Sequence, residues 1–370
     1  MGRVIRVKEI LNFLERGFAD LSRQYDWDNS GKQLILTDQK ISKTALALDP
    51  TEKVIEEAIK EGCELLITHH PLFFGKIRSL DISKTFDRKV IKAIQGGLSI
   101  VSAHTSLDLA DFSLNDYICK ILNANVVSSF IKEGADEYVK FVVFVPVAHA
   151  DKVREAIIKS GGGHIGNYSG CTFSISGEGT FIPEDGTNPF IGKKGELEKV
   201  QELRIETIIE KKNLSGLLKA VVEAHPYEEV AHDVYKLDMG KAYGLGRVGE
   251  LKEELSAEEF LGLVKSKLCA DTLRLNMNPE GRKIKKFAVV TGSGASLWKN
   301  CLSAGVDVLI TGDMKHHDSL DAKENGVMII DGGHYETEKI YMSFLAELLS
   351  KEFEIETVLI EEESSIINWR

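Results

Sequence analysis

Short apolar runs alternate with helical stretches at both ends of this 370-residue sequence. Apolar residues recur at helical spacing between the runs, in stretches such as 52–61, 85–96 and 256–268. This alternation is typical of βαβ units and predicts a parallel sheet with helices on its faces. The expected strands are 44–48, 65–68 and 98–102 near the start, and 248–251, 286–291, 308–311 and 327–330 near the end.

The middle of the chain has a different pattern. Strand-like and helical stretches there follow the order β-α-β, β-α-β, which fits a ferredoxin-like domain. The simplest account is one α/β domain, formed by residues 1–126 and 239–370, with a second domain inserted at 127–238. A surface loop tolerates such an insertion when its ends lie close together. The predicted fold class is therefore α/β, interrupted by an α+β insert.

Composition limits the partners and the location that we expect. The formal net charge is -11, and no cluster of Lys and Arg offers the basic surface that nucleic acid needs, which argues against a nucleic-acid partner. The five cysteines form no CxxC pair, which favours a reducing compartment over a disulfide framework or a thiolate zinc site. No apolar stretch reaches the length of about 18 residues that a membrane span requires. We therefore expect a soluble, cytoplasmic protein.

Three of the apolar runs are followed by histidine or carboxylate side chains. They are His69 and His70 after one run, Asp108 after the next, and His334 and Glu338 after the last. Open α/β sheets build their sites at the carboxyl ends of strands, so we expect these side chains to share one site. His334 and Glu338 are four residues apart and point the same way if their helix has already begun.

The five side chains offer nitrogen and oxygen donors without sulfur. This donor set suits Zn, Mn, Fe, Co or Ni and does not choose among them. Five donors are too many for one ion with an open position, and they fit two divalent ions that share a bridging carboxylate. Taken singly, His69 and His70 could be structural histidines and Asp108 a helix cap. The hypothesis of a dinuclear site rests on their combination.

A further polar cluster follows the expected strand 308–311. Within it, His316 or His317 could act as a general base, orient a metal ligand or hold the substrate. The alternative, that both are polar loop residues at the start of a helix, has similar support. We take both as candidate catalytic residues.

These motifs together resemble the Nif-three-like family, whose members are also called GTP cyclohydrolase 1 type 2. The matching motifs are Trp27-Asp28-Asn29, the stretch 67–74, His104-Thr105-Ser106-Leu107-Asp108, Thr311-Gly312-Asp313 with His316-His317, and Gly333-His334-Tyr335-Glu336-Thr337-Glu338. The insert is similar to the PII-like or CutA-like domain of the long bacterial members. That likeness rests on Gly166-Asn167-Tyr168-Ser169 and His225-Pro226-Tyr227-Glu228-Glu229-Val230.

The resemblance implies a dinuclear metal site and a toroidal homohexamer. In the family pattern, His70 and Asp108 hold one ion, His69 and His334 hold the other, and Glu338 bridges both. All of these positions are intact in this sequence. The resemblance therefore implies that the chain can bind two divalent ions.

The function expected from this reading is that of a metal-dependent hydrolase, in which metal-activated water attacks a nucleotide or a related small substrate. The family's name implies GTP ring opening, with attack at C8 of the purine and proton transfer by His316 or His317. A second hypothesis is a metal-binding regulatory or scaffold protein whose PII-like insert senses a small ligand. Metal storage or delivery is a third.

Overall fold

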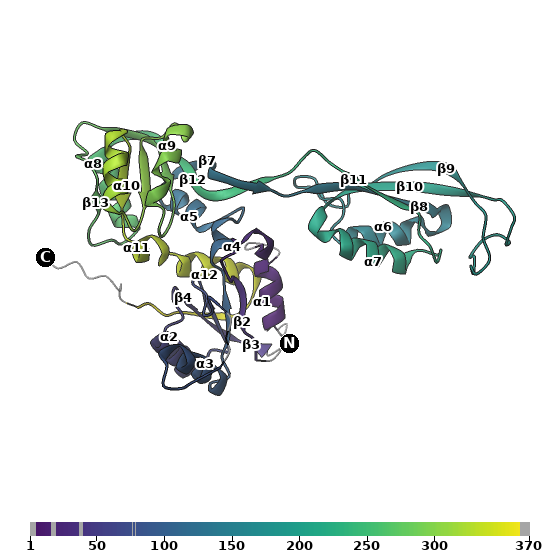
Figure 1. Ribbon diagram of the computed structural model, residues 1–370, viewed down its shortest axis with the longest axis horizontal. Helices are drawn as coiled ribbons and strands as arrows, with labels where there is room; N and C mark the ends of the chain where they lie inside the picture. The colour runs from purple at the N-terminus through teal and green to yellow at the C-terminus, as the bar shows by residue number, and fades with distance from the viewer. Residues whose placement is uncertain (1–4, 16–19, 37–39, 76, 78, 363–370) are drawn as a thin grey trace. The chain divides into compact units, whose positions relative to one another are not determined.

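The computed structural model describes residues 5–15, 20–36, 40–75, 77 and 79–362 (Figure 1). The chain forms two compact units, of which the first is discontinuous in sequence. It comprises 1–133 and 243–370, whereas the second comprises 134–242. The boundaries predicted after residues 126 and 238 lie slightly before those of the second unit. Among the described residues, no helix is long and apolar enough to cross a membrane.

The first unit contains a five-stranded sheet that is parallel except at one edge. Side chains alternate between its faces, so Leu65 and Ile67 enter one core and Leu66 enters the other. Helices α2 (Glu52–Lys60) and α3 (Thr85–Gln95) cover one face, and α1 (Val7–Phe13) and α12 (Tyr341–Glu352) the other. Burial on both faces explains why the central strands read as continuous apolar runs. In spatial order the strands are β17 (Glu356–Leu359), β4 (Lys43–Ala47), β5 (Leu65–Thr68), β6 (Ser99–Ser102) and β2 (Gly31–Leu34).

A second sheet of six strands belongs to the same unit, and β14, β15 and β16 within it run parallel. Helices α5 (Leu114–Ile121) and α8 (Ala257–Lys267) pack on one face, and α9 (Lys299–Ala304) and α10 (His316–Glu324) on the other. The strands in spatial order are β13 (Arg274–Leu275), β16 (Met328–Asp331), β15 (Val308–Thr311), β14 (Lys283–Val289), β12 (Ala242–Ser256) and β7 (Ala124–Ala135).

Each half of the chain contributes a strand to the sheet built mainly by the other half. The C-terminal β17 pairs with β4, and β7 from the first half lies at the edge of the second sheet. The strand ends predicted to share one site lie at two sheets, because β5 and β6 belong to the first and β15 and β16 to the second.

The second unit is an antiparallel four-stranded sheet with two helices on one face (Figure 1). Its β-α-β-β-α-β order is that of a ferredoxin-like domain. The predicted order contains a strand at this place, but the sequence pattern does not locate β9, because Gly177 and Gly179 lower its β propensity. The elements in chain order are β8 (Tyr138–Pro146), α6 (Ala150–Lys159), β9 (Phe173–Phe181), β10 (Glu198–Glu210), α7 (Leu214–Ala224) and β11 (His232–Lys236).

A buried ion pair fastens the two halves of the first unit together. Arg247 of β12 pairs through Nε with Asp116 of α5 at 2.8 Å, and both side chains are buried. Its Nη1 donates to the carbonyls of Gly244 and Gly246, and its Nη2 donates to that of Ala110 at 2.6 Å. Because the guanidinium also donates to three backbone carbonyls, these hydrogen bonds offset the desolvation cost that weakens most buried salt bridges.

Replacing Arg247 by Met should lower the free energy of unfolding by about 3–5 kcal/mol, because the Asp116 carboxylate would stay buried without its partner. The control is Lys283→Met, which removes a cation from an exposed pair with Glu254 and should change stability little. Urea denaturation followed by circular dichroism measures both. Equal, small shifts for the two variants would contradict this role of Arg247.

Candidate metal centre

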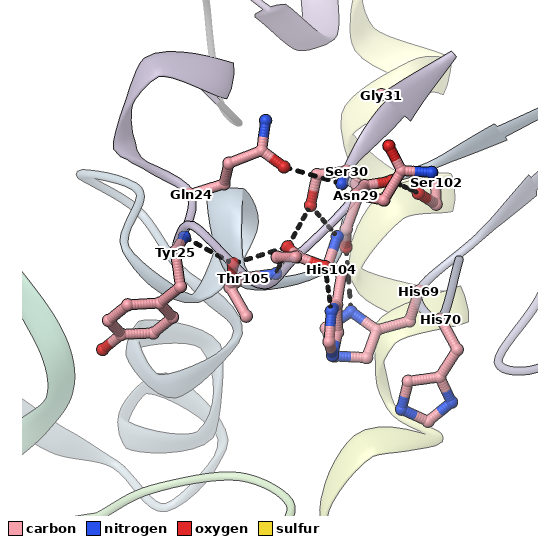
Figure 2. Close-up of polar contacts among 12 residues, drawn as sticks. Gln24, Tyr25, Asn29, Ser30, Gly31, His69, His70, Ser102, His104 and Thr105 are labelled. Atoms are coloured by element: carbon pink, nitrogen blue, oxygen red, sulfur yellow. Dashed lines mark hydrogen bonds and ion pairs between the residues drawn. The ribbon is translucent and has the colours of Figure 1, made fainter. Parts of the chain in front are cut away.

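Two adjacent histidines lie directly after β5 (Figure 2). Neighbouring side chains on a regular strand point to opposite faces, but β5 ends at Thr68, one residue earlier. The rings of His69 and His70 consequently lie with their centroids 5.2 Å apart. His69 is fully buried and His70 is mostly buried. Thr68 donates its hydroxyl to the carbonyl of His70 at 2.7 Å, which stabilises this turn of the backbone.

β6 supplies a third imidazole and a carboxylate. His104 precedes the short helix α4 (Thr105–Asp108), and its ring lies 5.2 Å from that of His69 and 5.4 Å from that of His70. Ligand atoms of the three histidines lie within 4.8 Å of one another. Asp108, one turn further on, is buried. His104 was not among the predicted ligands, and only its place after an apolar run could have pointed to it.

The second sheet supplies His334 and Glu338, on α11 (His334–Glu338) directly after β16. Nε2 of His334 lies 3.0 Å from Oε2 of Glu338, so the predicted helical spacing does bring the two together. Glu338 is buried, and its Oε2 also lies 3.2 Å from Nε2 of His70. Its Oε1 is 3.8 Å from Nε2 of His69. One carboxylate therefore meets imidazoles from both sheets.

Every imidazole of this cluster is anchored through Nδ1. The acceptors are oxygen atoms of carbonyl or carboxylate groups, so each Nδ1 donates and each Nε2 is turned toward the shared space. This is the arrangement in which histidines are oriented as metal ligands. The four contacts are His69 to the Ala103 carbonyl at 2.8 Å, His70 to Asp49 at 2.7 Å, His104 to Asp28 at 2.7 Å and His334 to Asp313 at 2.8 Å.

Asp28 shows how firmly one of these anchors is held. Its second oxygen accepts from the hydroxyl of Ser30 at 2.7 Å and from the backbone and hydroxyl of Thr105. Burial alone would raise the pKa of Asp28, but its hydrogen bonds to His104 and Thr105 outweigh burial and lower it. The carboxylate therefore stays ionised and keeps the His104 ring in place.

Three ligand atoms of the cluster, His69 Nε2, Asp108 Oδ1 and Glu338 Oε2, are buried without a hydrogen bond of ordinary geometry among the described residues. A buried polar atom without a partner is costly, and a cation is a partner that all three atoms accept. Nitrogen and oxygen donors, with no thiolate, fit a divalent transition metal or zinc. The residues present therefore fit a metal centre.

The imidazoles of His70 and His334 hold their protons tightly in the metal-free protein. Burial lowers the pKa of His70, but hydrogen bonds to Asp49 and Glu338 outweigh it and raise the value to about 10. The hydrogen bond to Glu338 raises the pKa of His334 to about 9. Glu338 itself is buried, yet its contacts with His334, His69 and His70 lower its pKa well below the usual range. Two imidazolium groups thus neutralise the central carboxylate until a metal replaces their protons.

Glycines make room for the central carboxylate. Gly292, after β14, has φ +64°, and a Cβ there would lie 2.2 Å from Glu338 Oε1. A Cβ at Gly312, after β15, would lie 2.7 Å from the backbone nitrogen of His334. Both loops therefore require glycine because backbone passes directly against the site.

The candidate catalytic pair lies apart from this cluster. His316 and His317 begin α10, are exposed, and contact each other with ring centroids 5.2 Å apart. The structure records no contact between either ring and the imidazoles described above. From the same polar stretch, Asp313 does reach the site, by anchoring His334. A catalytic role for His316 or His317 therefore stays a prediction.

Two exposed aromatic rings border His104. Trp27 and Phe74 are each 63% exposed, and their ring centroids lie 5.8 and 6.3 Å from the imidazole. Trp27 also stacks on Tyr25 at 5.8 Å. The amide of Asn29 donates to the carbonyl of Phe73 at 2.8 Å, which ties together the two loops that carry these rings. A planar ligand near the cluster would find aromatic surface here.

Comparison with known proteins identifies relatives along the whole chain. The sequence model of the family described as Duf34/NIF3 (NGG1p interacting factor 3) matches residues 5–365. A protein of Halalkalibacterium halodurans named "GTP cyclohydrolase 1 type 2 homolog" is 39% identical over 350 residues, which cover 94% of this chain and 93% of the relative. A protein of Bacillus subtilis with the same name is 36% identical over 341 residues, which cover 92% of this chain and 91% of that relative.

A solved structure agrees with these matches. The crystal structure of a Bacillus cereus protein related to NIF3 is 35% identical in sequence, has a TM-score of 0.86, and aligns over 100% of both chains. Family model, relatives and structure all match over nearly the full length. The chain therefore belongs to the Duf34/NIF3 family.

Proposed function

We propose that the protein is a metal-dependent hydrolase that uses two divalent ions and acts on a nucleotide or a related small molecule. The observation that carries this proposal is the convergence of Nδ1-anchored imidazoles on the buried carboxylate of Glu338. A purely structural cluster would not need His69 Nε2 and Asp108 Oδ1 to be buried without partners.

The resemblance assigns His70 and Asp108 to one ion and His69 and His334 to the other. Glu338 lies between the two proposed ligand sets, since its carboxylate is near His70 of one set and near His334 and His69 of the other, and this position supports a bridging role. Two ions held in this way would supply an activated water molecule and stabilise negative charge that develops on the substrate. Zn, Mn, Fe, Co and Ni all remain compatible with the donors.

His104 is the imidazole that this chain places best for holding a proton beside the metal ligands. It lies within the cluster, yet the family pattern does not use it as a ligand. Asp28 accepts from its Nδ1 and would stabilise the imidazolium formed when Nε2 takes a proton. We therefore propose His104 as a proton acceptor, and the catalytic role of His316 or His317 stays a proposal beside it.

The names of the relatives point to ring opening of GTP, and we extend that substrate class to this chain as part of the proposal. The rings of Trp27 and Phe74 beside His104 support a substrate with a planar base. We also propose, from the same resemblance, that the insert is PII-like or CutA-like and that the chain forms a toroidal homohexamer. Regulation through the insert is a second candidate function, favoured by a cavity of about 860 Å³ in that unit.

Glu338→Gln tests the proposed metal centre. The wild-type protein should hold about two ions per chain by mass spectrometry after equilibration with Zn or Mn, and the variant should hold fewer than about one. Glu336→Gln is the matched control, because it makes the same change of charge on the same helix without touching the cluster. Metal content that is near zero, or unchanged by Glu338→Gln, would contradict the proposal.

The same three proteins, together with His104→Gln, test the activity. Metal-loaded wild type should convert GTP or another purine nucleotide to a hydrolysed product detectable by mass spectrometry, and Glu338→Gln should lose at least about 100-fold in rate. His104→Gln should lower the rate while the metal content stays constant. A wild type that holds two ions and hydrolyses none of the nucleotides would refute the hydrolase and leave the metal centre standing.

Metal binding should release protons and tighten as pH rises. The pKa values of about 10 for His70 and about 9 for His334 mean that both imidazoles are protonated at neutral pH without metal. Binding must displace those protons, so affinity should increase by up to about tenfold per pH unit for each proton displaced, and level off only above pH 9–10. Titration calorimetry in buffers of different ionisation enthalpy measures this. An affinity that is constant between about pH 6.5 and 8.5 would contradict it.

A further inference from the structure

The insert has a large cavity on the side of its sheet that the helices leave free. Helices α6 and α7 cover one face, where Phe141, Ile205 and Leu217 form the core (Figure 1). The cavity has a volume of about 860 Å³ and is lined by β9, β10 and the loops at 182–191 and 227–231. Its size falls within the range of about 300–1,000 Å³ that is typical of small-molecule sites.

Two glycines of β9 leave its floor open. A Cβ at Gly177 would meet nothing within 4 Å, and one at Gly179 would lie 2.3 Å from Oε2 of Glu202. Glycine inside a strand weakens the strand, and it often marks a place where a ligand or another backbone approaches closely. In this strand the missing side chains expose the Glu202 carboxylate to the cavity.

Glu202 is a mostly buried carboxylate in the lining of this cavity. It is only 9% exposed, and no cation pairs with it anywhere in the fully described stretch 134–242. Arg204, two residues along the same face of β10, pairs with Glu206 at 3.5 Å instead. A buried carboxylate without a cation or a full set of hydrogen bonds carries a high desolvation cost. The cavity is the direction from which a cation can reach it.

Aromatic rings form the wall beside this carboxylate. The Tyr227 ring lies 5.8 Å from that of Phe181 and 6.3 Å from that of Phe190. The loop that carries Phe190 is tied down, because the backbone nitrogen of Asn188 donates to Glu228 at 2.9 Å. The Tyr227 hydroxyl is buried beside Glu202, and its pKa is raised by burial, then by the charge of Glu202 and by a hydrogen bond toward that carboxylate. It therefore remains protonated.

We propose that the insert binds an organic cation in this cavity, with an ammonium group at Glu202 and an apolar or aromatic body against Tyr227, Phe181 and Phe190. A carboxylate beside aromatic faces is the environment that recognises ammonium groups on apolar bodies. Glu184 and Glu229 also line the cavity and disfavour an anion. The buried, unpaired Nε of Arg204 adds a donor for an acceptor atom on the same ligand. This site is independent of the metal centre.

Three fluorinated probes of similar shape test the choice of charge on the full-length protein. They are 4-fluorophenethylamine, which is an ammonium at neutral pH, the uncharged 2-(4-fluorophenyl)ethanol, and the anionic 3-(4-fluorophenyl)propionate. Titrations followed by ¹⁹F NMR give the dissociation constants. The ammonium should bind at least about tenfold more tightly than the alcohol, and the anion should be the weakest. Equal binding of the three, or no binding at millimolar concentration, would overturn the proposal.

Variants locate the bound probe. Glu202→Gln should raise the dissociation constant of the ammonium probe by at least about tenfold and change that of the alcohol by no more than about twofold. Glu178→Gln is the matched control, because that carboxylate lines the same cavity but already pairs with Lys199 at 3.3 Å. Gly177→Leu should block both probes by filling open space without a clash. If only Glu178→Gln lost binding of the ammonium probe, the ammonium group would lie elsewhere than at Glu202. If the affinity for the probe fell as the protein concentration rose, a second copy of the chain would cover this face.

Discussion

The contact of Glu338 with histidines from two sheets is the interaction on which the first unit depends. Glu338 arrives from the second sheet, whereas His69 and His70 arrive from the first. A buried carboxylate is tolerable here only because imidazolium groups, or metal ions in their place, neutralise it. Gly292 and Gly312 let the backbone pass close to the site, and an oxygen acceptor fixes the Nδ1 atom of each imidazole. Both features preserve the contact between Glu338 and the histidines.

Much of this arrangement can be predicted from local sequence. Apolar runs buried on both faces predict β5, β6 and β16, and the residues that follow these runs include five of the histidines and carboxylates in the cluster. Helical spacing joins His334 to Glu338 without knowledge of the fold. The family resemblance added the pairing of ligands, and the full-length matches confirm that family.

What local patterns could not predict depends on contacts between distant segments. The strands divide between two sheets, and β17 and β7 each join the sheet built mainly by the other half of the chain. Asp49, Asp28 and Asp313 look like turn residues in sequence, and only the fold places each one on an imidazole. The position of β9 could not be predicted, because Gly177 and Gly179 weaken the β pattern of the strand. The same two glycines line the cavity of the insert.

Anomalous diffraction from crystals of the full chain grown with zinc or manganese would test the central claim most directly. The account predicts two peaks about 3.5–4 Å apart, with the Glu338 carboxylate between them. Each ion should be bound by Nε2 atoms at about 2.0–2.2 Å, because every Nδ1 is already committed to an oxygen acceptor. A single peak away from Glu338, ligation through Nδ1, or no peak at all would contradict it.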